Sequence, residues 1–216
     1  MSSNDIVYRE RTARGEAAGL VVLLHGVGAN EDSLMPLAEE LPAELHVILA
    51  RSPIALGPSA YGFFEVRFGA QGPVINPQQA EQSRITMTAF VQAQQERLDI
   101  STDKTLVAGF SQGGIMSASI ALTAPASVNG FGIFSGRILP EIEPHIPRDI
   151  ADYDLDALVT HGHADSKLPF ALAERSDAVL TQLGVAHSLK GYQCDHGLIP
   201  PMIEDIKAWV RQRLLS

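Results

Sequence analysis

The feature that most constrains this chain is a five-residue turn, Gly-Phe-Ser-Gln-Gly at 109–113, between a predicted strand and a predicted helix. The apolar run 105–108 precedes it, and small and aliphatic residues follow it. A serine in such a turn takes a strained backbone conformation, and small residues two positions on either side let the strand and helix approach closely. Gly109 and Gly113 meet this requirement. The turn therefore predicts a nucleophile elbow, in which the first helical amides face whatever Ser111 attacks.

Short apolar runs alternate with helix-like segments along the chain. Continuous apolar strands are typical of a parallel sheet whose two faces are covered by helices. We expect strands over 20–24, 47–50, 105–108, 131–134, 157–160 and 186–189, with an edge strand over 6–8. We expect helices over 34–40, 81–98, 112–123, 170–183 and 201–215. The alternation predicts an α/β architecture with a mostly parallel central sheet and helices on both faces.

The length of the chain bounds its domain organisation. At 216 residues it is long enough to bury a core and short enough to form one domain, so we expect a single domain over 1–216. Between 52 and 79, four prolines and several glycines predict a long irregular loop, of the kind that usually shapes a site. A chain of this length leaves no room for a large lid domain in addition to that single domain.

Charge and cysteine content narrow the partners and the compartment. A net charge of −9 leaves no basic face for nucleic acid or for an anionic membrane. Cys194 is the one cysteine, which excludes an intrachain disulfide, and the first residues lack the basic and apolar stretches of a secretory signal. No apolar run approaches the roughly twenty residues that span a bilayer. We expect a soluble cytoplasmic protein with no nucleic-acid partner and no stable membrane association.

A serine hydroxyl becomes a good nucleophile only when a neighbouring base takes its proton and a third group orients that base. Sites in such sheets lie at the carboxyl ends of strands, and the triad follows the chain order Ser, then Asp or Glu, then His. Asp165 lies a few residues after the strand predicted over 157–160, and His196 follows the last predicted strand. We therefore expect Ser111, Asp165 and His196 to be catalytic.

Other histidines need their own interpretation. His46 and His187 lie within or beside strands and His145 lies among prolines, so none of the three is expected to be catalytic. The sequence His161-Gly-His163-Ala-Asp165 is also a fragment of the metal-binding loop of metallo-hydrolases. Position 166 is a serine, however, and no second histidine cluster supplies further ligands. We expect no metal and no organic cofactor, and we interpret His161 as a structural residue.

An oxyanion hole needs two donors, and the second usually comes from the loop after an earlier strand. The loop at 24–30 has glycines at Gly26 and Gly28 that let its backbone approach the substrate. We expect the Val27 amide to pair with the Gln112 amide as oxyanion donors, and Gly26 to contact the substrate. The alternative, a phosphate-binding glycine turn, is weak because no lysine follows at the spacing of a P-loop.

Taken together, these motifs resemble the phospholipase/carboxylesterase group of α/β-hydrolases, which includes the acyl-protein thioesterases. The resemblance runs from about Gly19 to Val210. It is carried by five segments in order, namely Leu-His-Gly-Val-Gly-Ala-Asn at 24–30, Gly-Phe-Ser-Gln-Gly-Gly at 109–114, Phe-Ser-Gly at 134–136, His-Gly-x-x-Asp at 161–165 and His-Gly at 196–197. It implies an α/β-hydrolase fold and the same roles for Ser111, His196 and Asp165, with oxyanion donors at Val27 and Gln112.

We expect a serine hydrolase that cleaves small esters or thioesters of short to medium acyl chains through an acyl-enzyme. Phe63 and Phe64, with Phe68, are candidates for lining the acyl pocket, although buried aromatics are more often plain core. Exposed aromatics near Phe63 would also suit a homodimer. Two alternatives stay open from the sequence: an amidase or peptidase with the same triad, and a binding module that keeps the fold without turnover.

Overall fold

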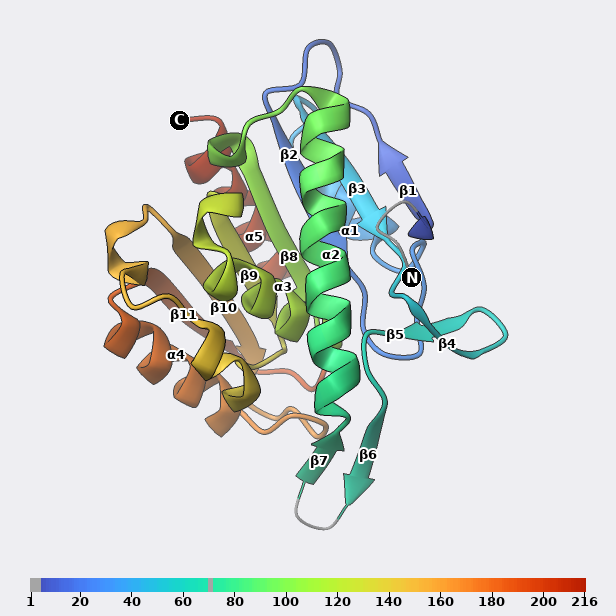
Figure 1. Ribbon diagram of the computed structural model, residues 1–216, viewed down its shortest axis with the longest axis vertical. Coiled ribbons are helices and arrows are strands. Elements are labelled where there is room, and N and C mark those ends of the chain that lie inside the picture. The colour runs from blue at the N-terminus through green and yellow to red at the C-terminus, as the bar shows by residue number, and fades with distance from the viewer. Residues whose placement is uncertain (1–4, 70–71) are drawn as a thin grey trace.

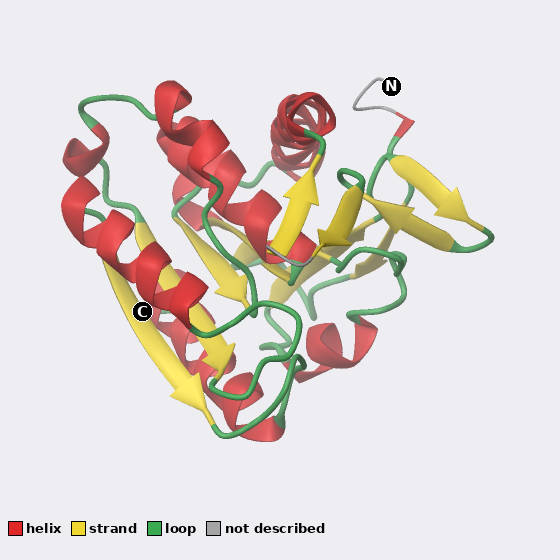
Figure 2. Ribbon diagram, turned by 90° about the horizontal axis from the view of Figure 1, so that it is seen from below, coloured by secondary structure: helices red, strands yellow, loops and turns green. Residues whose placement is uncertain are grey.

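The computed structural model describes residues 5–69 and 72–216, and in this part of the chain a seven-stranded sheet lies between two layers of helices (Figures 1 and 2). The strands of this sheet are β1 (Tyr8–Arg11), β2 (Gly19–Leu24), β3 (Leu45–Ala50), β8 (Thr105–Phe110), β9 (Gly130–Phe134), β10 (Asp156–Gly162) and β11 (Ala186–Tyr192). The α-helices are α1 (Met35–Glu40), α2 (Pro77–Leu98), α3 (Gln112–Thr123), α4 (Ala171–Leu183) and α5 (Pro200–Leu214). Short 3-10 helices cover Thr102–Lys104, Pro125–Ser127, Pro140–His145 and Ile150–Asp152.

The strand order is β1-β3-β2-β8-β9-β10-β11, and every pairing in it is parallel except that of β1 with β3. Parallel strands require crossovers, which here are the helices. The expected fold class is therefore confirmed, and in the part that the structure describes no separate lid domain lies over the carboxyl-terminal edge of the sheet. No helix of the described residues is long and apolar enough to cross a membrane.

Alternate residues of the central strand β2 enter two different cores, as the period of a strand requires. Leu20, Val22 and Leu24 belong to the core beneath α2, α3 and α4, whereas Val21 and Leu23 belong to the core beneath α1 and α5. All of β2 is buried. A strand covered on both faces must be apolar throughout, which explains the continuous runs in the sequence.

Two expectations about the segment 52–79 are wrong. It is not an irregular loop: β4 (Ile54–Gly57) pairs with β5 (Ala60–Gly62), and β6 (Val66–Gly69) pairs with β7 (Gly72–Ile75), each as an antiparallel hairpin. Helix α2 also begins at Pro77 rather than near 81, because the Asn76 side chain accepts a hydrogen bond from the Gln79 amide at 3.2 Å and caps it. The β6–β7 hairpin extends beyond the body of the sheet, beside the start of α2 (Figure 1).

Candidate active site

The turn between β8 and α3 has the conformation expected of a nucleophile elbow. Ser111 has φ 55° and ψ −116°, a left-handed value of φ that a residue with a side chain rarely takes. Its amide donates to the Phe134 carbonyl at 2.7 Å, which ties the turn to the end of β9. The neighbouring structure therefore holds the strained residue in place.

The two glycines of the elbow are required because backbones meet there. A Cβ at Gly109 would lie 2.6 Å from the Leu24 carbonyl oxygen, and one at Gly113 would overlap that same carbonyl. A Cβ at Gly26 would lie 3.4 Å from the Cβ of Ser111, so the loop after β2 passes directly beside the nucleophile. These approaches are what the spacing of the motif predicts.

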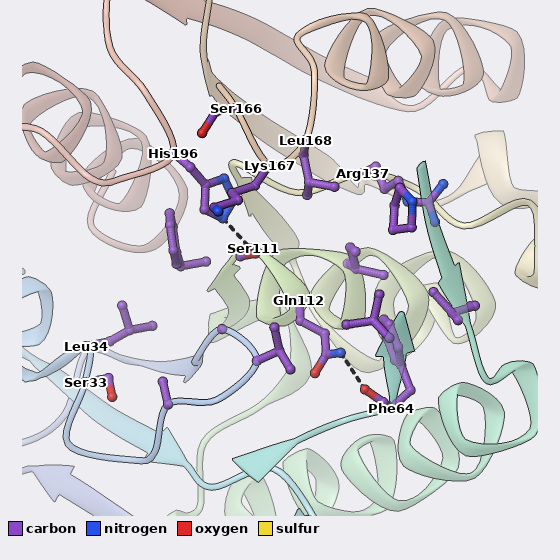
Figure 3. Close-up of a pocket in the computed structure, with 18 residues that line it drawn as sticks. Ser33, Leu34, Phe64, Ser111, Gln112, Arg137, Ser166, Lys167, Leu168 and His196 are labelled. Atoms are coloured by element: carbon purple, nitrogen blue, oxygen red, sulfur yellow. Dashed lines mark hydrogen bonds between the residues drawn. The ribbon is translucent and has the colours of Figure 1, made fainter. Parts of the chain in front are cut away.

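A continuous chain of hydrogen bonds links the three residues expected to be catalytic. Ser111 Oγ lies 2.9 Å from His196 Nε2, and His196 Nδ1 lies 2.7 Å from Asp165 Oδ2 (Figure 3 draws the first of these). The side chain of Asp165 is completely buried, whereas that of His196 is partly exposed to the cavity. Side chains from the ends of β8, β10 and β11 thus meet at one edge of the sheet.

Asp165 is held by more than the imidazole. Its Oδ1 accepts from the amides of Lys167 and Leu168, each at 2.8 Å. His161, also fully buried, lies with Nε2 3.1 Å from Asp165 Oδ2 and 2.7 Å from the Leu168 carbonyl. Burial lowers the pKa of His161, so it is neutral near pH 7. The expected structural role of His161 fits these contacts. His163 packs against Phe170 with the two rings tilted by 42° and their centroids 4.1 Å apart.

A second carboxylate, that of Asp195, joins the loops that carry the acid and the base. Asp195 Oδ1 accepts from the Ser166 amide at 2.8 Å and from the His196 amide at 2.7 Å. These hydrogen bonds, that from Ser166 foremost, lower the pKa of Asp195. Asp195 contacts the backbone of His196, whereas Asp165 contacts its ring, so the two acids have different tasks. Next to it, burial raises the pKa of the Cys194 thiol, which keeps it protonated and unreactive.

The loop after β2 is fixed by His25, for which the sequence suggested no separate role. Its Nδ1 donates to the Gly26 carbonyl at 2.7 Å, and its Nε2 accepts from the Ser52 amide at 3.0 Å. Burial lowers the pKa of His25, which favours this neutral state. The imidazole thus holds the backbone that leads to Val27.

A cavity of about 750 Å³ opens above Ser111. Gly26, Val27, Gln112 and His196 line it together with Ser111, so the residues expected to bind the oxyanion lie around the nucleophile (Figure 3). The first amides of a helix have no partner within the helix, which leaves that of Gln112 available to an acceptor in the cavity. Most of the remaining wall is apolar.

Of the aromatic residues expected to line the acyl pocket, one lines the cavity and one does not. Phe64 lines the cavity, whereas Phe63 is fully buried in the core and does not line it. The side chain of Phe68 lies outside the described part of the chain. Because Phe63 and Phe64 are both buried, the expectation of exposed aromatics near Phe63 is wrong for these two residues, and neither offers an exposed aromatic surface to a second copy of the chain.

The side chain of Gln112 builds the wall that carries Phe64. Its Oε1 accepts from the Phe63 amide and its Nε2 donates to the Phe64 carbonyl, each at 2.7 Å. Gln112→Ala leaves both buried backbone groups without partners, so we expect the free energy of unfolding to fall by about 2–4 kcal/mol. Urea unfolding followed by the fluorescence of Trp209 measures this.

The control is Gln78→Ala, which removes an exposed glutamine from the first turn of α2. Its free energy of unfolding is expected to stay within about 0.5 kcal/mol of the parent. An unchanged urea midpoint in Gln112→Ala would show that the two hydrogen bonds do not hold the wall.

The sequence matches the family model described as Phospholipase/Carboxylesterase over residues 10–214. It is 24% identical over 232 residues to acyl-protein thioesterase 1 of Gibberella zeae, a match that covers 99% of this chain and 98% of that protein.

Solved structures of similar shape agree with this match at the level of the fold. Esterase PE8 superposes with a TM-score of 0.85 at 23% identity, over 97% of this chain and 99% of that one. A carboxylesterase from Mesorhizobium loti superposes with a TM-score of 0.81 at 22% identity, over 94% and 93% of the two chains.

Proposed function

Since the chain belongs to the phospholipase/carboxylesterase family, and is therefore a serine hydrolase acting on carboxylic esters or thioesters, we propose that Ser111, His196 and Asp165 form its catalytic triad. The observation that carries this proposal is the unbroken series of contacts from Ser111 Oγ to His196 Nε2 and from His196 Nδ1 to Asp165 Oδ2. In each pair the two atoms already lie within hydrogen-bonding distance, as general-base catalysis requires.

The reaction proceeds in two steps. Ser111 Oγ attacks the ester carbonyl while His196 Nε2 takes the hydroxyl proton, and the imidazolium then gives that proton to the departing alcohol or thiol. In the second step His196 takes a proton from a water molecule, which attacks the acyl-serine carbonyl. The imidazolium then returns that proton to Ser111 Oγ as the acyl–Oγ bond breaks, which releases the acid and restores the hydroxyl. Throughout the reaction the carboxylate of Asp165 accepts a hydrogen bond from the N–H at Nδ1 of His196. This keeps Nε2 free to act as the base and stabilises the imidazolium.

Negative charge develops on the carbonyl oxygen during each attack. The amides of Val27 and Gln112 are the proposed donors to it, since both residues line the cavity beside Ser111. Gln112 also begins α3, so the positive end of the helix dipole faces the same point.

The substrates are proposed to be small esters or thioesters with short to medium acyl chains. A largely apolar cavity of about 750 Å³ suits such a chain, and Phe64 forms part of its wall. An amidase would use the same triad, and a binding module would keep the cavity without turnover, so activity has to separate the three.

The test is a panel of para-nitrophenyl esters of increasing acyl length, with matched thioesters and para-nitroanilides. We expect kcat/KM to be highest for an ester or thioester of short to medium chain and far lower for every anilide. Anilides cleaved as fast as esters would favour the amidase. No turnover of any substrate by folded protein would favour the binding module.

A further inference from the structure

The charged side chains that line the cavity are of one sign. Its wall holds two cationic side chains, Arg137 and Lys167, and no aspartate or glutamate among the described residues that line it. The chain as a whole carries a net charge of −9. A cavity whose described wall carries cations and no carboxylate, in a chain with 25 Asp and Glu against 16 Lys and Arg, favours an anionic ligand over a cationic one.

Among the described residues, none forms a hydrogen bond or ion pair with the side chain of Arg137. Its Nε is buried and has no hydrogen-bond acceptor, and among the described residues no carboxylate lies within 4 Å of its guanidinium. Glu141 and Arg175 act on it only as more distant charges. Burial lowers the pKa of Arg137, but a guanidinium stays charged at any physiological pH. A half-buried charge without a counter-charge is costly, and an arginine fork is suited to bind a carboxylate.

The position of Arg137 tells which part of a substrate it meets. It follows the end of β9, where a Cβ at Gly136 would lie 2.9 Å from the Ser111 carbonyl oxygen, so this loop packs against the elbow. Figure 3 shows Ser111 between His196 on one side and Arg137 on the other. His196 must protonate the leaving group, so the leaving group lies on its side of Ser111 and the acyl group extends away from it.

We propose that Arg137 binds the far end of the acyl group, and that the preferred substrates are esters or thioesters whose acyl chain ends in a carboxylate, that is, monoesters of dicarboxylic acids. The chain of such an acid would lie along the apolar wall formed by residues such as Phe64, Ile75 and Ile115. Its terminal carboxylate would then accept hydrogen bonds from the guanidinium. This inference rests on the proposed function, because it assigns the acyl side from the role of His196.

The test compares pairs of esters that differ only at the end of the acyl chain. Mono-para-nitrophenyl adipate is matched with para-nitrophenyl hexanoate, and the suberate with the octanoate. The measured quantity is the ratio of kcat/KM for the acidic ester over its neutral match, since the ratio cancels losses common to both. We expect the wild-type ratio to exceed one and Arg137→Met to lower it about tenfold to a hundredfold, the range of a charged hydrogen bond. Arg137→Lys is expected to restore part of it.

Two further variants serve as controls. Arg175→Met removes an exposed arginine whose charge acts on Arg137 but which does not line the cavity, and it is expected to keep the wild-type ratio. Lys167→Met removes the cation that Figure 3 places beside His196, on the proposed leaving-group side. A ratio that falls in Lys167→Met but not in Arg137→Met would overturn the proposal, as would a wild-type ratio of one or less.

The failure of this inference can be told from that of the proposed function. If Ser111→Ala still hydrolyses the hexanoate, the triad itself is wrong. If hexanoate hydrolysis depends on Ser111 while the ratio is the same in wild type and Arg137→Met, the triad stands and the carboxylate preference is wrong.

Discussion

Ser111→Ala is expected to lower kcat for para-nitrophenyl butyrate about a millionfold, equivalent to about 8 kcal/mol of activation free energy. The variant keeps the cavity and the proposed oxyanion amides, but it has no atom that can form the acyl-enzyme. Alanine has the same Cβ as serine, so it adds no steric strain at the φ of 55° that Ser111 already takes in the elbow. The loss is therefore expected in turnover and not in folding. Initial rates, with circular dichroism as a check on the fold, measure it.

Ser119→Ala is the matched control. This serine is also in α3 and buried, but its Oγ donates to the Ile115 carbonyl at 2.8 Å and does not reach the cavity. It is expected to retain parental turnover. Parental turnover in Ser111→Ala would show that Ser111 takes no part in the reaction.

Asp165→Asn is expected to lower kcat about ten-thousandfold while leaving the protein folded. The amide matches the carboxylate in size and can still accept the backbone bonds from Lys167 and Leu168. It no longer carries the charge that stabilises the His196 imidazolium, and its NH₂ group favours the tautomer in which Nε2 holds a proton. A base in that tautomer does not accept the proton of Ser111.

Asp195→Asn tests whether this effect belongs to the correct acid. Asparagine keeps an oxygen that accepts from the amides of Ser166 and His196, so a far smaller loss of kcat is expected. The kcat values of the two variants, measured under the same conditions, give the comparison. Parental activity in Asp165→Asn together with lost activity in Asp195→Asn would reverse the assignment.

Much of the fold follows from local patterns. Strands covered on both faces are apolar throughout, so their positions were predictable, and α3 spans 112–123 as expected. The order of the triad along the chain was also informative, because parallel strands place their carboxyl ends at one edge. Asp165 and His196 were selected because they follow such strand ends. In the structure Asp165 lies within hydrogen-bonding distance of His196, and His196 within hydrogen-bonding distance of Ser111.

The segment 52–79 shows where local patterns mislead. Its prolines were all interpreted as loop signals, yet Pro77 stands in the first turn of a helix, where a missing amide hydrogen has no cost. The capping Asn76 before it was a readable signal that this interpretation overlooked. Phe63 and Phe64 were expected to line the acyl pocket, but their neighbours in sequence do not show which of the two faces the cavity. Their burial depends on the packing of this segment against α2 and α3, which only the tertiary fold creates.

The contacts of the site that the sequence did not predict share one property. The contacts of Asp195, of the Gln112 side chain and of His25 join segments far apart in the sequence, and no spacing or periodicity encodes such pairs. Arg137 stands out because the described cavity wall around it is largely apolar and has no carboxylate. Residues far apart in the sequence form that wall, so the sequence alone does not reveal it. Of these, only His25 had a local hint, since it directly precedes the Gly26 turn.

If Ser111 is a nucleophile activated by His196, a fluorophosphonate should label it at a rate that depends on His196. The label is located by peptide mass spectrometry of wild type and His196→Ala. We predict one modified residue, Ser111, in the wild type and a labelling rate that collapses in His196→Ala. A label on another residue, or a wild-type protein that hydrolyses esters while Ser111 stays unmodified, would contradict the account.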